Sequence, residues 1–308
     1  MLKKFIFIAI IILIFTAYFI GNYFVNFSLK RTPINDSPAA DSHLNNPASA
    51  SETLPSDLHE AWNVVSIDGL NLNAVHFIPN HQCHRYVILI HGYGCDQRYS
   101  WDYAPTYLQY DFDVVTPDLR ACGMSEGMYL TMGVKESDDI LIWIEKIIEH
   151  DEQAQIILHG VSMGAATALI AASKCDSPNL VAVISDCAYT RVYDIFCDQL
   201  VQIFNLPTFP IMDCVEIVSK LKTGVSISEA APIDYVQNIR VPVLFIHGTA
   251  DNLVPYHMMY QLYNNCGSNI KEKETFDDVA HASAKIADPN RYYNCIFNFL
   301  LKNVHCNT

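Results

Sequence analysis

The segment from His159 to Gly164 reads HGVSMG and contains the pattern G-x-S-x-G. It follows a short apolar run at residues 156–158 and precedes an alanine-rich stretch that favours a helix. A serine at a sharp turn between a strand and a helix exposes its Oγ, and flanking glycines avoid the clash that a Cβ would cause there. This context predicts that Ser162 is a nucleophile, and a plain serine N-cap of the helix is the alternative.

A serine hydroxyl needs a general base, and the imidazole that serves as base needs a carboxylate to orient it. Asp251 follows the apolar run at residues 241–246, and His281 lies thirty residues further on, before the last predicted helix. The order Ser, Asp, His is the one that α/β folds with such a turn use. We therefore predict Asp251 as the acid and His281 as the base.

Other residues compete for these two roles. Asp251 could simply form a turn or cap a helix, and Asp186, which directly follows the apolar run at residues 180–185, is the second candidate acid, although it could instead brace a loop. Three other histidines also end predicted strands, and a structural role is the favoured interpretation for them: His91, His159 and His247.

The first strand of the predicted core ends in the sequence His91-Gly92-Tyr93-Gly94. Glycines at this point let the backbone approach a reacting carbonyl group closely. We predict that the backbone amides of Tyr93 and Met163 form an oxyanion hole, whereas the alternative is that the glycines only turn the chain.

The elements that must position these residues follow from the apolar pattern. Short apolar runs separated by helix-like stretches predict strands covered on both faces, and hence a largely parallel sheet in an α/β fold. The clearest helix is predicted at residues 135–150, and a β-hairpin around Asp68 and Gly69 is predicted at residues 62–79. Ligands bind such sheets beyond the carboxyl ends of the strands. The runs that predict strands are residues 86–90, 114–115, 156–158, 180–184 and 241–246.

The interval from residue 189 to residue 231 interrupts this alternation. It carries more apolar residues than a plain crossover between strands needs. Long insertions often cover active sites, so we predict a cap here, with an ordinary helix and an irregular loop as the alternative.

The first 29 residues predict a membrane anchor. No charged residue occurs from Phe5 to Leu29, and a helix of that length measures about 37 Å, enough to cross a hydrocarbon core of about 30 Å. A cleaved signal segment is the alternative, but the nearest suitable cleavage site, at residues 48–50, lies far downstream. The positive-inside rule slightly favours an internal N-terminus, which would leave the following domain on the extracytoplasmic side.

The next 30 residues, 30–59, have the composition of a flexible linker, rich in Pro, Ser, Asn and Ala. The candidate nucleophile, acid and base, Ser162, Asp251 and His281, then all fall in one predicted domain at residues 60–308. The formal net charge of −14 disfavours binding to nucleic acid. The ten cysteines show no zinc-ligand spacing, so we expect no metal site and interpret most of them as small buried residues.

Taken together, the motifs resemble those of the α/β-hydrolase superfamily, and in particular its membrane-anchored YqkD-like and BEM46-like serine hydrolases. The resemblance covers about residues 62–304. It implies an eight-stranded core with a cap, no cofactor, and hydrolysis of an ester or amide through an acyl-enzyme on Ser162. The matching stretches read ILIHGYG, VVTPDLRACGMSEG, LTMGVKESDDILIWI, ILHGVSMGAATALI, ISDCAYT, APIDYV, PVLFIHGTADNLVP and VAHASA.

One stretch departs from the pattern of these relatives. Where they commonly have Asp-x-Arg-Gly-x-Gly-x-Ser, this chain has Ala121 in place of the first glycine. We interpret Asp118 and Arg120 in this stretch as structural residues that shape a loop near the site.

The leading functional hypothesis is a carboxylic ester hydrolase acting on a small-molecule substrate. Aminopeptidase-like activity on peptide-like substrates and lipase or lipid thioesterase activity are alternatives within the same chemistry. A membrane-tethered binding protein without turnover is the alternative of another class. The sequence leaves the oligomeric state open.

Overall fold

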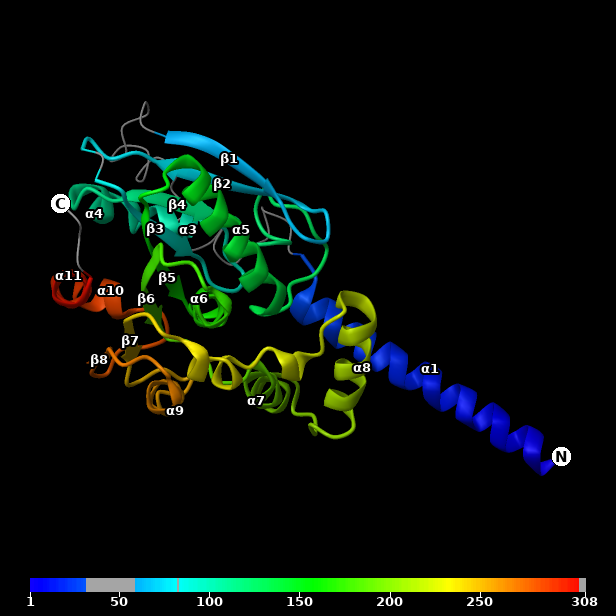
Figure 1. The fold of residues 1–308 in the computed structure, drawn as a ribbon. Helices are drawn as coiled ribbons and strands as arrows, with labels where there is room; N and C mark the ends of the chain where they lie inside the picture. The colour runs from blue at the N-terminus through cyan, green and yellow to red at the C-terminus, as the bar shows by residue number, and fades with distance from the viewer. Residues whose placement is uncertain (32–58, 82, 305–308) are drawn as a thin grey trace.

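The computed structural model describes residues 1–31, 59–81 and 83–304. Within these residues the chain forms one eight-stranded sheet with the order β1-β2-β4-β3-β5-β6-β7-β8 (Figure 1). The β1–β2 and β2–β4 pairs are antiparallel, and all other neighbours run parallel. The predicted α/β class is confirmed. The strands are β1 His59–Val65, β2 Asn71–Phe77, β3 Arg85–Ile90, β4 Asp113–Pro117, β5 Gln155–Val161, β6 Leu180–Asp186, β7 Val243–Gly248 and β8 Lys271–Phe276.

Helices cover both faces of the sheet. Helices α5, α6 and α9 contribute to the hydrophobic core on one face, and α4 and α11 to the core on the other. The α-helices are α1 Leu2–Leu29, α3 Gln97–Trp101, α4 Ala104–Gln109, α5 Val134–His150, α6 Met163–Lys174, α7 Val192–Phe204, α8 Ile211–Thr223, α9 His257–Asn265, α10 Ala284–Ala287 and α11 Pro289–Asn303. Short 3-10 helices follow α8 at Ile227–Glu229, Pro232–Asp234 and Val236–Asn238.

The continuous apolar runs of the central strands follow from this double covering. In β3, Ile88 and Ile90 face the core that contains α5 and α6, whereas Val87 and Leu89 face the core that contains α11. Successive side chains of a strand point to opposite faces, so a strand buried on both faces must be apolar at every position.

The edges of the sheet obey a different pattern. The predicted hairpin is confirmed as β1 and β2, and Gly69 in its turn adopts a φ of +85°, a conformation that favours glycine. At the other edge β8 has the polar sequence KEKETF, which the apolar pattern does not predict as a strand. β8 pairs with β7 alone and only Phe276 among its side chains is buried, so it needs no apolar pattern.

The loop after β4 contains the departure from the family pattern. Asp118 accepts hydrogen bonds from the backbone amides of Gln97 and Met124, each at 2.8 Å. Arg120 is buried and pairs with Asp139 at 2.7 Å. Both side chains brace the loop, as expected. Ala121 adopts a φ of +59°, so it occupies the left-handed region where relatives commonly have glycine.

Helix α1 projects away from the domain, with its C-terminal part beside α8 (Figure 1). It is long and apolar enough to cross a membrane by length and composition. Its last turns are attached to the domain, because Gly21, Val25 and Leu29 are buried. Of the predicted linker, residues 32–58 lie outside the described residues. Lys30 forms an isolated β-bridge with Tyr129.

Between β6 and β7 the interval at residues 189–231 folds into α7, α8 and the first 3-10 helix. α7 and α8 follow one another around the domain end of α1 (Figure 1). Phe204 of α7 stacks edge-to-face on Phe24 of α1, with ring centres 5.2 Å apart. Helix α1 and the segment between β6 and β7 therefore share one apolar interface.

Candidate active site

Ser162 occupies the sharp turn between β5, which ends at Val161, and α6, which begins at Met163. Its φ of +57° and ψ of −117° form a strained conformation for a residue with a side chain. A Cβ on Gly160 would lie 2.1 Å from the backbone oxygen of Gly164, so only glycine fits there. The strand and helix therefore pack tightly enough to keep the strained serine in place.

The three side chains proposed from the sequence meet at this turn. His281 Nε2 lies 2.8 Å from Ser162 Oγ, and His281 Nδ1 lies 2.6 Å from Asp251 Oδ2. The Asp251 side chain is fully buried, whereas that of His281 is 19% exposed. The arrangement forms an unbroken hydrogen-bonded path from a buried carboxylate to a serine hydroxyl.

Packing between two loops brings the acid and the base together. A Cβ on Gly248, at the end of β7, would lie 2.2 Å from the backbone oxygen of Val279. The amide of Ala250 donates to Val279 O at 3.1 Å, and the amide of Asp278 donates to Thr249 Oγ1 at 2.9 Å. The turn that carries Asp251 is therefore fastened to the loop that carries His281.

Asp251 stays ionised although it is buried. Burial raises the pKa of its carboxyl, but hydrogen bonds with His247 and His281 outweigh that effect and keep the pKa below its usual range. The backbone amide of Val254 also donates to Asp251, at 2.8 Å. A charged acid suits a partner that must stabilise an imidazolium.

His247 belongs to this site, which the sequence did not indicate. Its Nε2 lies 3.1 Å from Asp251 Oδ2 and 2.9 Å from the backbone oxygen of Val254. Its position at the end of a strand suggested only a structural role, and the contact with Asp251 depends on the turn that follows. We infer that His247 orients the carboxylate.

The second candidate acid lies elsewhere. Asp186 is buried and accepts a hydrogen bond from Tyr292 at 2.9 Å; burial raises the pKa of its carboxyl, and no hydrogen bond between it and His281 occurs among the described residues. Tyr292 in turn lies 3.0 Å from His159 Nε2, and His159 Nδ1 lies 2.8 Å from Tyr107. Asp186 therefore anchors a buried network beneath the site.

The histidines at the ends of β3 and β5 are structural. His91 is buried, with Nδ1 2.9 Å from Gly92 O, and its Nε2 accepts from the amide of Leu119 at 3.1 Å. Burial, aided by the charge of Lys285, lowers the pKa of His159 from 6.5 to about 3. Both imidazoles are therefore neutral parts of the core.

The burial of His159 predicts a dependence of stability on pH. The unfolded chain binds a proton on this imidazole below pH 6.5, but the folded chain does so only below about pH 3, so stability is lost as pH falls through this window. We expect the stability advantage of wild type over His159→Gln to shrink by about 1.4 kcal/mol per pH unit there. Thermal unfolding of the full chain in detergent measures it. The exposed His257→Gln variant should track wild type, and a constant difference between wild type and His159→Gln would contradict this origin.

The two predicted oxyanion donors flank Ser162. Met163 is the first residue of α6, where backbone amides have no partner within the helix. A Cβ on Gly92 would lie 3.5 Å from Ser162 Cβ, which brings the chain before Tyr93 next to the serine. Tyr93 and Met163 both line the cavity that Ser162 borders.

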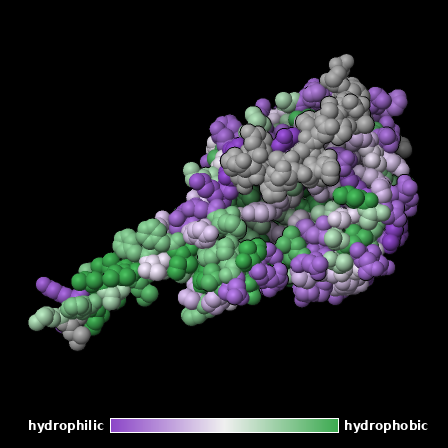
Figure 2. Space-filling model, turned by 180° about the vertical axis from the view of Figure 1, so that it is seen from behind, coloured by the Kyte–Doolittle hydropathy of each residue, from purple (hydrophilic) through white to green (hydrophobic). Residues whose placement is uncertain are grey.

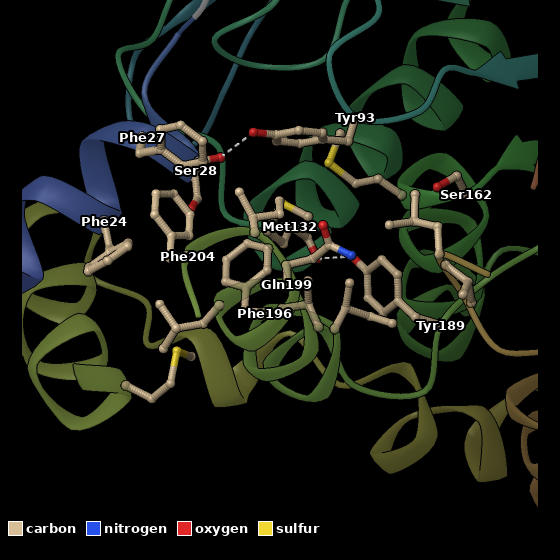
Figure 3. Close-up of a pocket in the computed structure, with 18 residues that line it drawn as sticks. Phe24, Phe27, Ser28, Tyr93, Met132, Ser162, Tyr189, Phe196, Gln199 and Phe204 are labelled. Atoms are coloured by element: carbon tan, nitrogen blue, oxygen red, sulfur yellow. Dashed lines mark hydrogen bonds between the residues drawn. The ribbon is translucent and has the colours of Figure 1, made fainter. Parts of the chain in front are cut away.

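That cavity has a volume of about 350 Å³, within the range typical of small-molecule sites. None of the described residues that line it is charged, and most are aliphatic or aromatic. Ser162 lies at one end, and Phe24, Phe27 and Phe204 lie at the other (Figure 3). The lining residues are Phe24, Phe27, Ser28, Tyr93, Met132, Ser162, Met163, Tyr189, Val192, Ile195, Phe196, Gln199, Leu200, Ile203, Phe204, Met212, Leu253 and Val254.

Sequence reasoning missed the contribution of α1 to this cavity. The first 29 residues were interpreted only as an anchor, because an apolar helix of that length is explained by a membrane alone. The aromatic residues at its C-terminal end, Phe24 and Phe27, were the only signal, and they do not differ in type from the rest of the helix.

A metal ion has little to bind at this site. Cys187, Asp251 and His281 bring possible ligand atoms within 4.8 Å of one another. The carboxylate and the imidazole are already bonded to each other, and burial raises the pKa of the Cys187 thiol well above its usual range. A protonated thiol is a poor ligand, so these residues suit proton transfer better than metal binding.

Comparisons with known proteins agree with the fold. A model of the alpha/beta hydrolase family matches residues 87–210. YqkD of Bacillus subtilis, itself uncharacterised, is 28% identical over 204 residues, which are 66% of this chain and 67% of YqkD. Protein bem46 of Schizosaccharomyces pombe is 27% identical over 201 residues, 64% of this chain but only 60% of bem46.

Among solved structures, the esterase Pf2001 of Pyrococcus furiosus matches with a TM-score of 0.67 at 21% identity. The match covers 84% of this chain and 96% of the esterase, so the similarity of fold extends over most of both chains. The fold, the family model and the relatives agree: the chain has the α/β hydrolase fold and is similar to YqkD and bem46.

Proposed function

We propose that this protein is a serine hydrolase that cleaves a carboxylic ester through an acyl-enzyme on Ser162. The single observation that carries the proposal is the path of two hydrogen bonds from Asp251 through His281 to Ser162 Oγ, at 2.6 and 2.8 Å. Nucleophile, base and orienting acid within hydrogen-bond reach are the signature of this chemistry.

In the proposed mechanism His281 Nε2 accepts the Ser162 proton as Oγ attacks the ester carbonyl carbon. The backbone amides of Tyr93 and Met163 stabilise the oxyanion that develops. His281 then donates the proton to the leaving alcohol, and a water molecule hydrolyses the acyl-enzyme with His281 again acting as base. Asp251 stabilises the imidazolium at each step.

The lining of the cavity favours an ester over the N-terminus of a peptide. An aminopeptidase must recognise a protonated amine, and such recognition normally uses a carboxylate. None of the described residues that line this cavity is acidic.

We further propose that α7 and α8 form a cap over the site and that α1 anchors the protein in a membrane.

Labelling with a fluorophosphonate probe tests the nucleophile directly. We expect the full chain in detergent to bind one probe at neutral pH, on the peptide that contains Ser162, because only a serine activated by a base reacts quickly with phosphorus. Mass spectrometry of the digested protein measures the site, and the heat-unfolded protein is the control that should stay unlabelled.

Two results would contradict this proposal. Labelling on a different serine would place the nucleophile elsewhere. Wild type that neither binds the probe nor hydrolyses short p-nitrophenyl esters would favour the tethered binding protein without turnover.

A further inference from the structure

Two groups of exposed residues line the cavity beside Ser162, and they indicate two openings to the surface. Phe27 of α1 and Ile203 of α7 are 57% and 60% exposed, which indicates a distal opening between these two helices. Tyr93 and Leu253 also line it and are exposed, beside the serine. The opening at Tyr93 lies next to Ser162. The opening at Phe27 lies at the aromatic cluster of Phe24, Phe27 and Phe204, at the other end of the apolar passage that leads to Ser162 (Figure 3).

Helix α1 is fixed in position as a wall of this passage. A Cβ on Gly21 would lie 2.3 Å from the backbone oxygen of Cys214 in α8, so the two helices are in backbone contact. Lys222 at the end of α8 donates to Asn26 Oδ1 at 2.7 Å, and the Tyr93 hydroxyl donates to Ser28 O at 2.8 Å. The same helix therefore touches α8 and the loop after β3.

The rest of α1 has the length of a membrane core. Residues 3–20 are exposed except for Ala17 and Ile20, which are partly buried, and they measure about 27 Å at 1.5 Å per residue, close to a hydrocarbon thickness of about 30 Å. The apolar surface of α1 continues onto the neighbouring part of the domain (Figure 2). Exposed apolar residues of α7, α8 and their connection include Val201, Ile203, Leu206, Phe209 and Ile217.

These positions put the distal opening of the cavity beside the point where α1 would leave a bilayer. Large exposed apolar surfaces mark sites that contact a protein, a ligand or a membrane, and the position of this one beside a candidate membrane span favours contact with lipid. An opening at that level would receive molecules from the bilayer. A hydrocarbon chain fits the uncharged lining, whereas an ionic or sugar-like group would lose its hydration there without compensation.

We propose that the cavity binds the acyl chain of a fatty-acyl ester that resides in the same membrane and enters between α1 and α7. This inference rests on the proposed serine hydrolase function and adds the substrate class. Ser162 Oγ bonds to the acyl carbon as the ester C–O bond breaks, and the alcohol leaves with the proton from His281. Water then adds to the acyl carbon, its proton passes through His281 to Ser162, and a fatty acid is released.

A series of p-nitrophenyl esters tests this substrate class. The full chain is incorporated into phosphatidylcholine vesicles and given the acetate, butyrate, octanoate and dodecanoate esters. Each methylene that enters the cavity should raise kcat/KM about fourfold until the cavity is full. Octanoate, with four more methylenes, should therefore exceed butyrate by roughly 250-fold.

Ile203→Glu places a charge in the passage and should remove most of this gain. The loss should be at least tenfold larger for octanoate than for acetate, because a hydrocarbon chain in the passage lies against the charge at position 203, whereas a small ester reaches Ser162 past Tyr93. The matched control is Ile67→Glu in the turn between β1 and β2, which is 83% exposed, neither lines the cavity nor belongs to the apolar surface of α7 and α8, and should keep the wild-type series.

A second pair of variants tests the wall that α1 provides. Gly21→Leu removes the backbone contact with α8 and should lower dodecanoate turnover at least tenfold more than acetate turnover. Ala9→Leu, in the part of α1 that stands clear of the domain, should leave both rates unchanged. If Gly21→Leu does not fold, the Ile203→Glu comparison still decides the question.

The results separate this inference from the proposed function. An enzyme that binds the fluorophosphonate probe and hydrolyses acetate, but gains nothing from longer acyl chains, would overturn the acyl-chain site alone. Equal loss on all esters in Ile203→Glu would also overturn it. Failure of both labelling and acetate turnover would overturn the serine hydrolase itself.

Discussion

Replacing Ser162 with alanine is expected to lower kcat for p-nitrophenyl acetate by about 10⁶-fold, to a residual rate supplied by binding and oxyanion stabilisation alone. The variant has no oxygen to form the acyl-enzyme, and His281 Nε2 loses the partner that lies 2.8 Å away. Steady-state release of p-nitrophenol from the full chain in detergent measures the loss. The strain at this position should also be retained, since alanine has the same backbone preferences.

The control for this prediction is Ser173→Ala in the same helix, α6. Its hydroxyl only donates to Ile170 O, at 2.7 Å, near the other end of the helix. Turnover in this variant should match wild type. A Ser162→Ala protein that retains more than about a hundredth of wild-type activity would assign the nucleophile to another residue, because loss of the nucleophile costs far more.

The second large effect is expected at Asp251. In Asp251→Asn the amide can donate a proton to His281 Nδ1, which favours the tautomer with its proton on Nε2. That tautomer cannot accept the Ser162 proton, and we expect kcat to fall by about 10⁴-fold although the geometry is preserved. The change also removes the charge that His247 contacts at 3.1 Å. Ester hydrolysis at neutral pH measures the effect.

The exposed Asp277→Asn variant, in the loop that leads to His281, controls for loss of a nearby negative charge. It should reduce turnover by less than about twofold, because an exposed charge is screened by water and salt. Similar losses in Asp251→Asn and Asp277→Asn would mean that general electrostatics, and not the tautomer of His281, govern the rate. Asp186→Asn is no substitute as a control, since it would disturb the buried network of Tyr292 and His159.

Several features were open to prediction because their signals are local. The turn around Ser162 follows from glycines on either side of a serine between an apolar run and a helix former, and the structure has that turn with a φ of +57°. The predicted helix at residues 135–150 and the central strands followed from periods of 3.6 and from short apolar runs. Each of these patterns is complete within about 20 residues.

Other features depended on chain segments that lie far apart in the sequence. β8 carries no apolar alternation, because an edge strand needs none, so only its pairing with β7 defines it. The contact of His247 with Asp251 depends on how the turn after β7 folds back. The choice between Asp186 and Asp251 as the partner of His281 likewise depended on the packing of two loops, with Gly248 against Val279.

By itself, the sequence determined the fold class, the length and apolar character of the N-terminal segment, and the three side chains that suit acyl transfer, since these rest on residue type and short-range period. Only the tertiary structure decided that these side chains come within hydrogen-bond distance and that α1 forms one wall of the cavity. The physical reason is that the sequence of an apolar helix does not indicate what covers it, because lipid and a protein groove can both bury the same apolar side chains. The backbone contact at Gly21 is therefore seen only in the structure, where α8 lies against α1.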